Sequence, residues 1–296
     1  MKAFNVKIAL AYFGVIIIWS STPTAIKWSS HGLDQYSSLL ARVGLATLFV
    51  LLFAIIFQKK PQWNRPALLH YLSANIGATG SLLLVYIASE YVPPGIISVL
   101  FGLSPILTGL LSQVWLKENK IAHHEWFAFL LGLSGLGIIF IEQIFQKNVS
   151  LFGFIMLFCS VLAHAASSVF VKKYPLNVHP LSSVSGTLVM SLPVISIVSL
   201  VHHDQFFFKP DTTALLSILY LSLFGSVLAL FCFFYLLKNL KATTVNLATL
   251  ITPVLGLIFS VVLNHDSFGA NIYLGTGLIL SALSLYLYGH KIIKSR

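Results

Sequence analysis

The chain has 296 residues, of which 57% are hydrophobic and only 9% are charged, and its mean hydropathy is +0.89. Ordinary soluble domains carry about 25% charged residues, so this composition excludes a soluble globular fold. The net charge of +10 does not indicate nucleic-acid binding, because no run of Lys and Arg exceeds two residues. The two cysteines lie inside apolar runs and predict neither a disulfide framework nor a metal site.

Apolar runs of about twenty residues, long enough for a helix to cross the hydrocarbon core, alternate with short charged or turn-rich breaks. They predict an all-α membrane protein with ten transmembrane helices. The predicted spans are 6–27, 35–57, 66–89, 94–116, 125–145, 150–171, 180–201, 212–237, 243–264 and 269–289.

The basic residues predict the orientation of these spans. Cytoplasmic loops of membrane proteins carry an excess of Lys and Arg. With the N-terminus in the cytoplasm, only Lys147 and Lys209 fall in loops on the opposite side, while Lys27 and Arg42 lie within or at the edge of spans. We therefore expect a multi-pass protein of the cell (inner) membrane with both termini cytoplasmic.

Two spans share an unusual build, an apolar run interrupted by a hydroxyl residue and a proline. The stretch "VLFGLSPILTGLLSQVWLKEN" at 99–119 is matched by "LATLITPVLGLIFSVVLNHDS" 148 residues later. Pro105 and Pro253 thus occupy equivalent places. Proline is tolerated in a membrane helix where a break lines a cavity. Both prolines are predicted to kink their helices at a central cavity, although they could instead only shape packing.

The repeat extends back to the first span. At an offset of 145 residues, Trp19 falls on His164 and Lys27 on Lys172. The pattern predicts two repeats of five helices, 1–146 and 147–296. Because five is odd, the second repeat must be inverted in the membrane. Inverted repeats are typical of carriers that alternate access to a midplane site.

On several of these residues the chain resembles the ten-helix EamA-type transporters of the drug/metabolite transporter superfamily. The resemblance rests on the following positions: Trp19 to Lys27, Arg42, Ser104-Pro105 followed by Glu118, and Thr252-Pro253. Asp266 in "NHDS" and the "AHAASS" stretch at 163–168 depart from the family pattern. The resemblance implies transport of amino acids, nucleosides or other small metabolites and leaves the substrate open.

The favoured function is a secondary transporter that moves a small polar or amphipathic metabolite by alternating access. A flippase for a lipid-linked substrate, which would need a laterally open groove, is an alternative. A membrane-embedded enzyme would need clustered titratable groups, and only His164 is available inside a span. We expect no enzymatic activity, cofactor or metal. The expected partners are a small-molecule substrate and the lipid bilayer, without nucleic acid, and the chain as a monomer or homodimer.

Polar and aromatic residues inside the spans are the candidates for substrate binding. Asn246, Thr249 and Thr252 are spaced by three, which places them on one side of a helix. His164 could instead be a hydrogen-bonded packing residue, and the aromatic residues could face lipid. The predicted substrate-binding residues are Trp19, Asn75, Tyr86, Phe101, Ser104, His164, Ser167, Tyr235, Asn246, Thr249 and Thr252.

Two basic residues in spans are predicted to act as a gate or as structural charges. Arg42 could alternatively bind a substrate carboxylate or phosphate, and Lys27 could extend to water at the outer surface. No Asp or Glu lies deep in a span. This favours facilitated diffusion or exchange over tight proton coupling, with His164 as the one deep group that could carry a proton.

Overall fold

The computed structural model describes residues 6–116, part of 124–138, 150–202, 209–265 and 267–294, and the regular secondary structure of this part is helical. The first half contains α1 (Val6–Ser29), α2 (Gln35–Ile56), α3 (Arg65–Asn75), the π-helical segment η1 (Ile76–Ser81), α4 (Leu82–Ala88), α5 (Pro94–Phe101) and α6 (Ser104–Trp115). The second half contains α8 (Leu151–Lys173), α9 (Pro180–Val201), α10 (Thr212–Tyr220), the π-helical segment η2 (Leu221–Leu228), α11 (Ala229–Asn239), α12 (Ala242–Asn246), the 3₁₀ segment η3 (Leu247–Leu250), α13 (Thr252–Asn264) and α14 (Ala270–Lys294).

Within the described residues, seven helices are long and apolar enough to cross a membrane. Two shorter apolar helices, Val254–Leu263 and Ala270–Tyr286, lie in the predicted ninth and tenth spans. Only about half of the residues of the predicted fifth span, 125–145, are described. The chain is therefore an all-helical membrane protein as predicted, while the count of ten spans stays a prediction. The seven long helices are Val6–Ser29, Gln35–Ile56, Arg65–Ala88, Pro94–Trp115, Leu151–Lys173, Pro180–Val201 and Thr212–Asn239.

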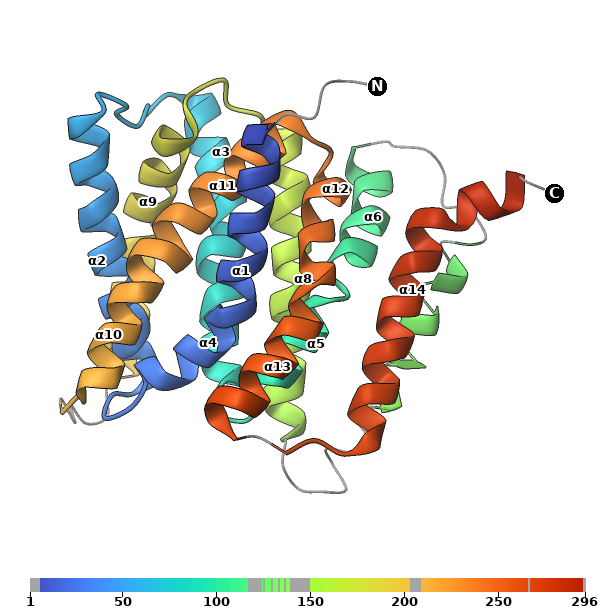
Figure 1. Cartoon of the computed structure of the whole chain (residues 1–296). Coiled ribbons are helices and arrows are strands. Elements are labelled where there is room, and N and C mark those ends of the chain that lie inside the picture. Colours follow the sequence, from blue (N-terminus) through green and yellow to red (C-terminus); the bar gives the residue numbers. More distant parts are fainter. Residues whose placement is uncertain are drawn as a thin grey trace.

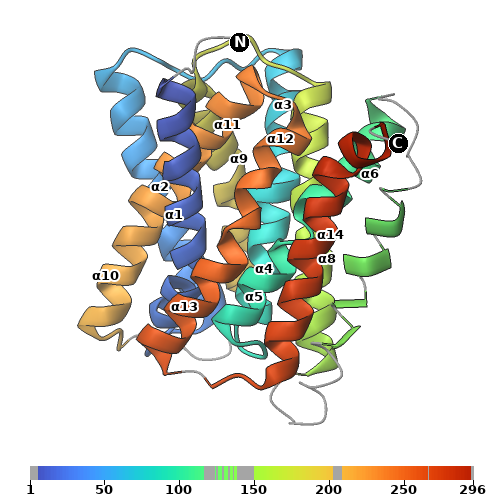
Figure 2. The ribbon, with the colours of Figure 1, turned by 45° about the vertical axis from the view of Figure 1, so that its right-hand side comes forward.

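The helices form one bundle in which helices from the two halves lie next to each other (Figure 1). In this view α1 descends and α8 ascends, so the first helix of each half runs in the opposite direction. The second helices, α2 and α9, pack against each other, as do α5 and α13. Figure 2 shows α14 at the edge of the bundle, where it packs against α6.

A glycine permits the contact between α5 and α13. A Cβ atom added at Gly256 would lie 2.0 Å from the hydroxyl oxygen of Ser98. Such small residues let membrane helices approach closely, which replaces the hydrophobic driving force that lipid cannot provide. Between α2 and α9, the Thr47 hydroxyl donates a hydrogen bond to the carbonyl oxygen of Leu188 at 3.3 Å.

The third helical run of each half begins with a side-chain cap. The side-chain oxygen Oδ1 of Asn64 accepts a hydrogen bond from the Ala67 backbone N–H at 3.0 Å. The Asp211 carboxylate accepts one from the Ala214 N–H at 2.7 Å. These caps satisfy N–H groups that have no partner within the first turn of a helix.

Both of these runs are interrupted by a π-helical segment, η1 in the first half and η2 in the second. An offset of 145 residues aligns Gly80 with Gly225 and Ser81 with Ser226, so the two segments occupy equivalent places. π-helical turns are rare and frequently lie at functional sites. The sequence analysis did not predict them.

The two predicted proline kinks take the form of helix breaks. Helix α5 ends at Phe101, and Pro105 lies in the first turn of α6. In the second half η3 ends at Leu250, and Pro253 lies in the first turn of α13. The missing proline N–H costs little there, because first-turn N–H groups have no acceptor within the helix. Each proline therefore opens a new helix instead of bending a continuous one.

Candidate functional site

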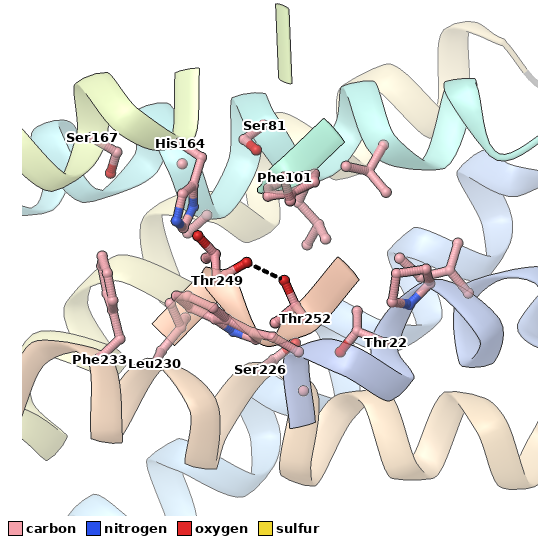
Figure 3. A pocket seen from close by; sticks show the side chains of 18 of the residues that line it. Thr22, Ser81, Phe101, His164, Ser167, Ser226, Leu230, Phe233, Thr249 and Thr252 are labelled. Carbon is pink, nitrogen blue, oxygen red and sulfur yellow. Dashed lines mark hydrogen bonds between the residues drawn. The ribbon is translucent and has the colours of Figure 1, made fainter. Parts of the chain in front are cut away.

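A central cavity lies between the two halves of the bundle, with about 1040 Å³ of space that protein atoms do not occupy. Figure 3 shows side chains from several helices pointing into this space. Hydroxyl groups, one histidine and one arginine interrupt a mainly apolar wall. The polar lining residues are Thr22, Arg42, Ser81, Ser98, His164, Ser167, Ser226, Thr249 and Thr252.

The two halves contribute to this wall from equivalent positions. Five pairs of lining residues are related by the repeat, four at an offset of 145 residues and one at 148. Both halves therefore contribute to the wall of the cavity from matching positions in the repeat. The pairs are Trp19 with His164, Thr22 with Ser167, Ser81 with Ser226, Val85 with Leu230, and Phe101 with Thr249.

His164 lies in an aromatic cluster on the cavity wall. Its ring centroid is 5.2 Å from that of Trp19, 5.7 Å from Phe101 and 5.8 Å from Phe233. The Trp19 and Phe101 contacts are edge-on, a geometry that the aromatic quadrupole favours. In Figure 3 the imidazole of His164 points from α8 toward the side of the cavity where Phe233 lies.

Asn246 at the end of α12 holds this histidine from behind the wall. Its side-chain oxygen accepts hydrogen bonds from His164 Nε2 and from the Ser104 hydroxyl, both at 3.1 Å. Its side-chain nitrogen donates to the Ala242 carbonyl oxygen at 3.0 Å. Because the oxygen is an acceptor, the Nε2 atom of His164 carries a proton. The fully buried amide of Asn246 is thus satisfied and joins α6, α8 and α12.

Arg42 brings a positive charge to the wall of the cavity from α2. Its side chain is only 3% exposed, and Nε donates a hydrogen bond to the Ser226 hydroxyl at 3.0 Å. The guanidinium carbon lies 5.8 Å from the centroid of the Tyr86 ring. The Nη1 atom has no hydrogen-bond partner, and no carboxylate among the described residues pairs with Arg42. A buried charge without a counter-charge is costly.

Seven of the residues singled out from the sequence line the cavity. They are Trp19, Arg42, Phe101, His164, Ser167, Thr249 and Thr252. Whether they bind substrate stays a prediction.

The remaining candidates lie elsewhere. Ser104 and Asn246 stand directly behind the wall. Asn75 lies between α3 and α9, where its side-chain nitrogen donates to the Tyr71 and Thr187 carbonyl oxygens.

The other candidates also do not line the cavity. Tyr86 is fully buried, and Tyr235 packs in a hydrophobic cluster. Lys27 lies in the last turn of α1, partly buried and away from the cavity. Glu118 and Asp266 lie outside the described residues.

Several lining residues escaped the sequence analysis, among them Thr22, Ser81, Ser98 and Ser226. Two signals were available. Thr22-Pro23 is a third hydroxyl–proline pair of the kind found at Ser104-Pro105. Ser81 and Ser226 are related by the same offset that relates Trp19 to His164.

No group of three or more His, Cys, Asp or Glu side chains suited to a metal ion is present in the described part of the chain.

Comparison with known proteins gives consistent results. The chain is 25% identical over 289 residues to the uncharacterized inner membrane transporter YedA of Escherichia coli (strain K12), covering 94% of this chain and 90% of that protein. It is 26% identical over 278 residues to the uncharacterized transporter YoaV of Bacillus subtilis (strain 168), covering 93% and 94%. A protein of known crystal structure is similar in fold, with a TM-score of 0.71 at 14% identity over 95% of this chain and 96% of the other. The EamA-like transporter family matches residues 6–141 and 151–288. The resemblance seen in the sequence is thus confirmed, and the chain belongs to the EamA-like transporter family.

Proposed function

We propose that this protein is a secondary carrier that moves a small polar or amphipathic metabolite across the cell membrane by alternating access. The observation that carries the proposal is the central cavity lined from equivalent positions of the two halves. A site on the symmetry axis of two related halves can open to either side while its wall stays the same. Membership of a transporter family supports the same function.

The proposal includes ten helices in two inverted repeats, 1–146 and 147–296, with both termini cytoplasmic. The opposite directions of α1 and α8 support the inversion (Figure 1). The distribution of basic residues supports the orientation.

An amino acid fits this cavity better than an uncharged metabolite. Arg42 lines the cavity, so its guanidinium would bind a carboxylate, and the aromatic wall around Trp19 and Phe233 would cover an apolar side chain. Carboxylate recognition by Arg42 would supply the counter-charge that the described residues lack. A nucleoside, which would use the hydroxyl groups and the aromatic rings, is the second substrate class.

We propose that transport proceeds by exchange or facilitated diffusion and is not coupled to a proton gradient. The three described acids, Asp34, Glu90 and Asp211, all lie at helix ends or in loops. Reconstituted vesicles test this directly. With the voltage clamped, a pH gradient should not drive accumulation of the substrate against its own gradient. Such accumulation, abolished by His164→Gln with exchange retained, would establish a proton cycle instead.

The substrate can be found by a thermal-shift screen of amino acids and nucleosides on the purified protein. Each ligand found is then tested for exchange in proteoliposomes.

A pair of variants tests whether the cavity wall takes part in transport. Thr249→Val should lower exchange several-fold, while Thr276→Val in α14 should not. In each threonine the hydroxyl donates a hydrogen bond to a nearby carbonyl oxygen of its own helix. The two variants therefore lose the same kind of hydrogen bond, and a difference in exchange between them reports the position of Thr249 on the cavity wall. Absence of saturable exchange for every stabilising ligand would contradict the proposed carrier.

Cysteine labelling tests the orientation. Cys159 and Cys232 are free thiols and are first replaced by serine. A cysteine at Lys209 should react with an impermeant reagent in intact cells, and one at Lys60 only after permeabilisation. The reverse pattern would overturn the proposed topology.

A further inference from the structure

A second hollow lies outside the central cavity, on the flank formed by α2, α9, η2 and α11. It contains about 1010 Å³ of space unoccupied by protein atoms. Four of the residues that line it are phenylalanines, and Phe57 and Phe224 are 62% and 41% exposed. We call it the flank groove. Its lining residues are Phe53, Phe57, Lys59, His179, Leu181, Leu223, Phe224, Val227, Leu228 and Phe231.

One end of the flank groove is basic. Lys59 follows α2, and His179 precedes α9 with its ring 5.8 Å from that of Phe231. Lys238 is close by, since its Nζ donates a hydrogen bond to the Val178 carbonyl oxygen at 3.2 Å. None of the described residues lining the groove carries a carboxylate. The end of α2 and the start of α9 lie at the same edge of the bundle as the start of α1 (Figure 1).

We propose that the flank groove is a binding site for an anionic phospholipid of the bilayer. The phosphate of the headgroup lies between Lys59, His179 and Lys238, and an acyl chain lies along Phe53, Phe224 and Phe231. Any lipid chain can cover exposed phenylalanines, but only an anionic headgroup complements the basic end. Basic pockets between membrane helices bind anionic headgroups in this way.

The groove and the central cavity share a wall. Gly225 and Ser226 of η2 line the cavity, whereas Phe224 and Leu228 of the same segment line the groove. A lipid in the groove therefore packs on the outer face of the segment whose inner face holds Ser226 against Arg42. Occupancy of the groove stabilises the contact between η2 and α2.

Native mass spectrometry of the purified full chain tests the proposal. The protein is titrated with phosphatidylglycerol and, separately, with phosphatidylcholine of the same acyl chains. We expect tighter binding of phosphatidylglycerol. Lys59→Gln and Lys238→Gln should each weaken it about fivefold, and the double variant more, with little change for phosphatidylcholine.

Lys60→Gln is the matched control, because Lys60 is an exposed neighbour of Lys59 that does not line the groove. Phe224→Ala should weaken the binding of both lipids. Equal binding of the two lipids by the unmodified protein would overturn the proposal. So would an equal loss of phosphatidylglycerol affinity in Lys60→Gln and Lys59→Gln. An unchanged melting temperature of the lipid-free variants shows that they fold.

Discussion

The indole ring of Trp19 in α1 meets the imidazole ring of His164 in α8 edge-on, with 5.2 Å between the ring centroids. These residues are related by the 145-residue repeat, so equivalent positions of the two first helices touch across the central cavity. His164 is held from the other side by Asn246. The histidine is therefore fixed between a symmetry mate and a buried amide.

Asn246→Ala should lower both stability and transport. The change leaves the buried Ser104 hydroxyl and the imidazole of His164 without their acceptor. A buried polar group without a partner costs about 1–3 kcal/mol. The melting temperature of the purified protein and exchange in vesicles measure the two effects. Asn239→Ala is the control, because Asn239 bonds to its own helix at an exposed position. Equal losses in the two variants would count against the role of Asn246.

Arg42→Gln should weaken the transport of an amino acid about ten- to hundredfold, the range expected for a lost hydrogen bond to a charged group. The corresponding amine, which lacks the carboxylate, should be affected much less. Comparison of KM for the two compounds separates carboxylate recognition from a structural role of Arg42. Arg65→Gln, at an exposed position in the first turn of α3, should change neither KM. An equal effect of Arg42→Gln on both compounds would assign Arg42 to gating or packing.

Gly186→Ala should destabilise the contact between α9 and α3. A Cβ atom at Gly186 would lie 2.1 Å from the Cζ atom of the fully buried Tyr71 ring. Overpacking of this kind costs about 1–3 kcal/mol. Gly44→Ala in α2 is the control, because its added methyl group would meet nothing within 4 Å. A lower melting temperature is expected for Gly186→Ala alone, and matching values for the two variants would contradict the prediction.

The stability of the protein should fall in acid partly because of His179. Partial burial, and then the positive charges of Lys59 and Lys238, lower the pKa of His179 from its ordinary value of 6.5. Its neutral Nδ1 accepts a hydrogen bond from the Leu181 N–H at 3.3 Å, which caps α9. Because the folded state has the lower pKa, unfolding takes up a proton. The contribution of His179 is complete above pH 6.5 and is lost as the pH falls through the lowered pKa.

Melting temperatures measured from pH 7.5 to pH 5 check this prediction. His179→Asn retains a capping side chain that does not titrate, so its melting temperature should fall less than that of the unmodified protein. His202→Asn, at the other end of α9, is the control. Its melting temperature should fall with pH by as much as that of the unmodified protein. An unaltered pH dependence in His179→Asn would show that the cap does not titrate in this range.

The sequence predicted the seven long spans and the presence of two repeats, because runs of apolar residues and the spacing of prolines are properties of the chain itself. Trp19 and His164 were matched only as equivalent positions of the repeat, and their contact appeared only in the structure. It was harder to predict which face of each helix lines the cavity. In α1 apolar residues surround the helix, so periodicity does not separate the side that holds Thr22 from the side that meets lipid. Asn75 and Tyr86 were reasonable cavity candidates, but their neighbours in α9 and α2 are set by packing between distant segments.

The two π-helical segments also affect which residues of the third helical run of each half face the cavity. A π turn holds one residue more than an α turn. Segments η1 and η2 interrupt the third run of each half at equivalent residues, with Gly80-Ser81 repeated as Gly225-Ser226. One extra residue turns the rest of a helix by about 100° around its axis. Val85 and Leu230, which follow the two segments, line the cavity from equivalent positions. Both halves therefore need the same irregular turn to present these residues to the cavity.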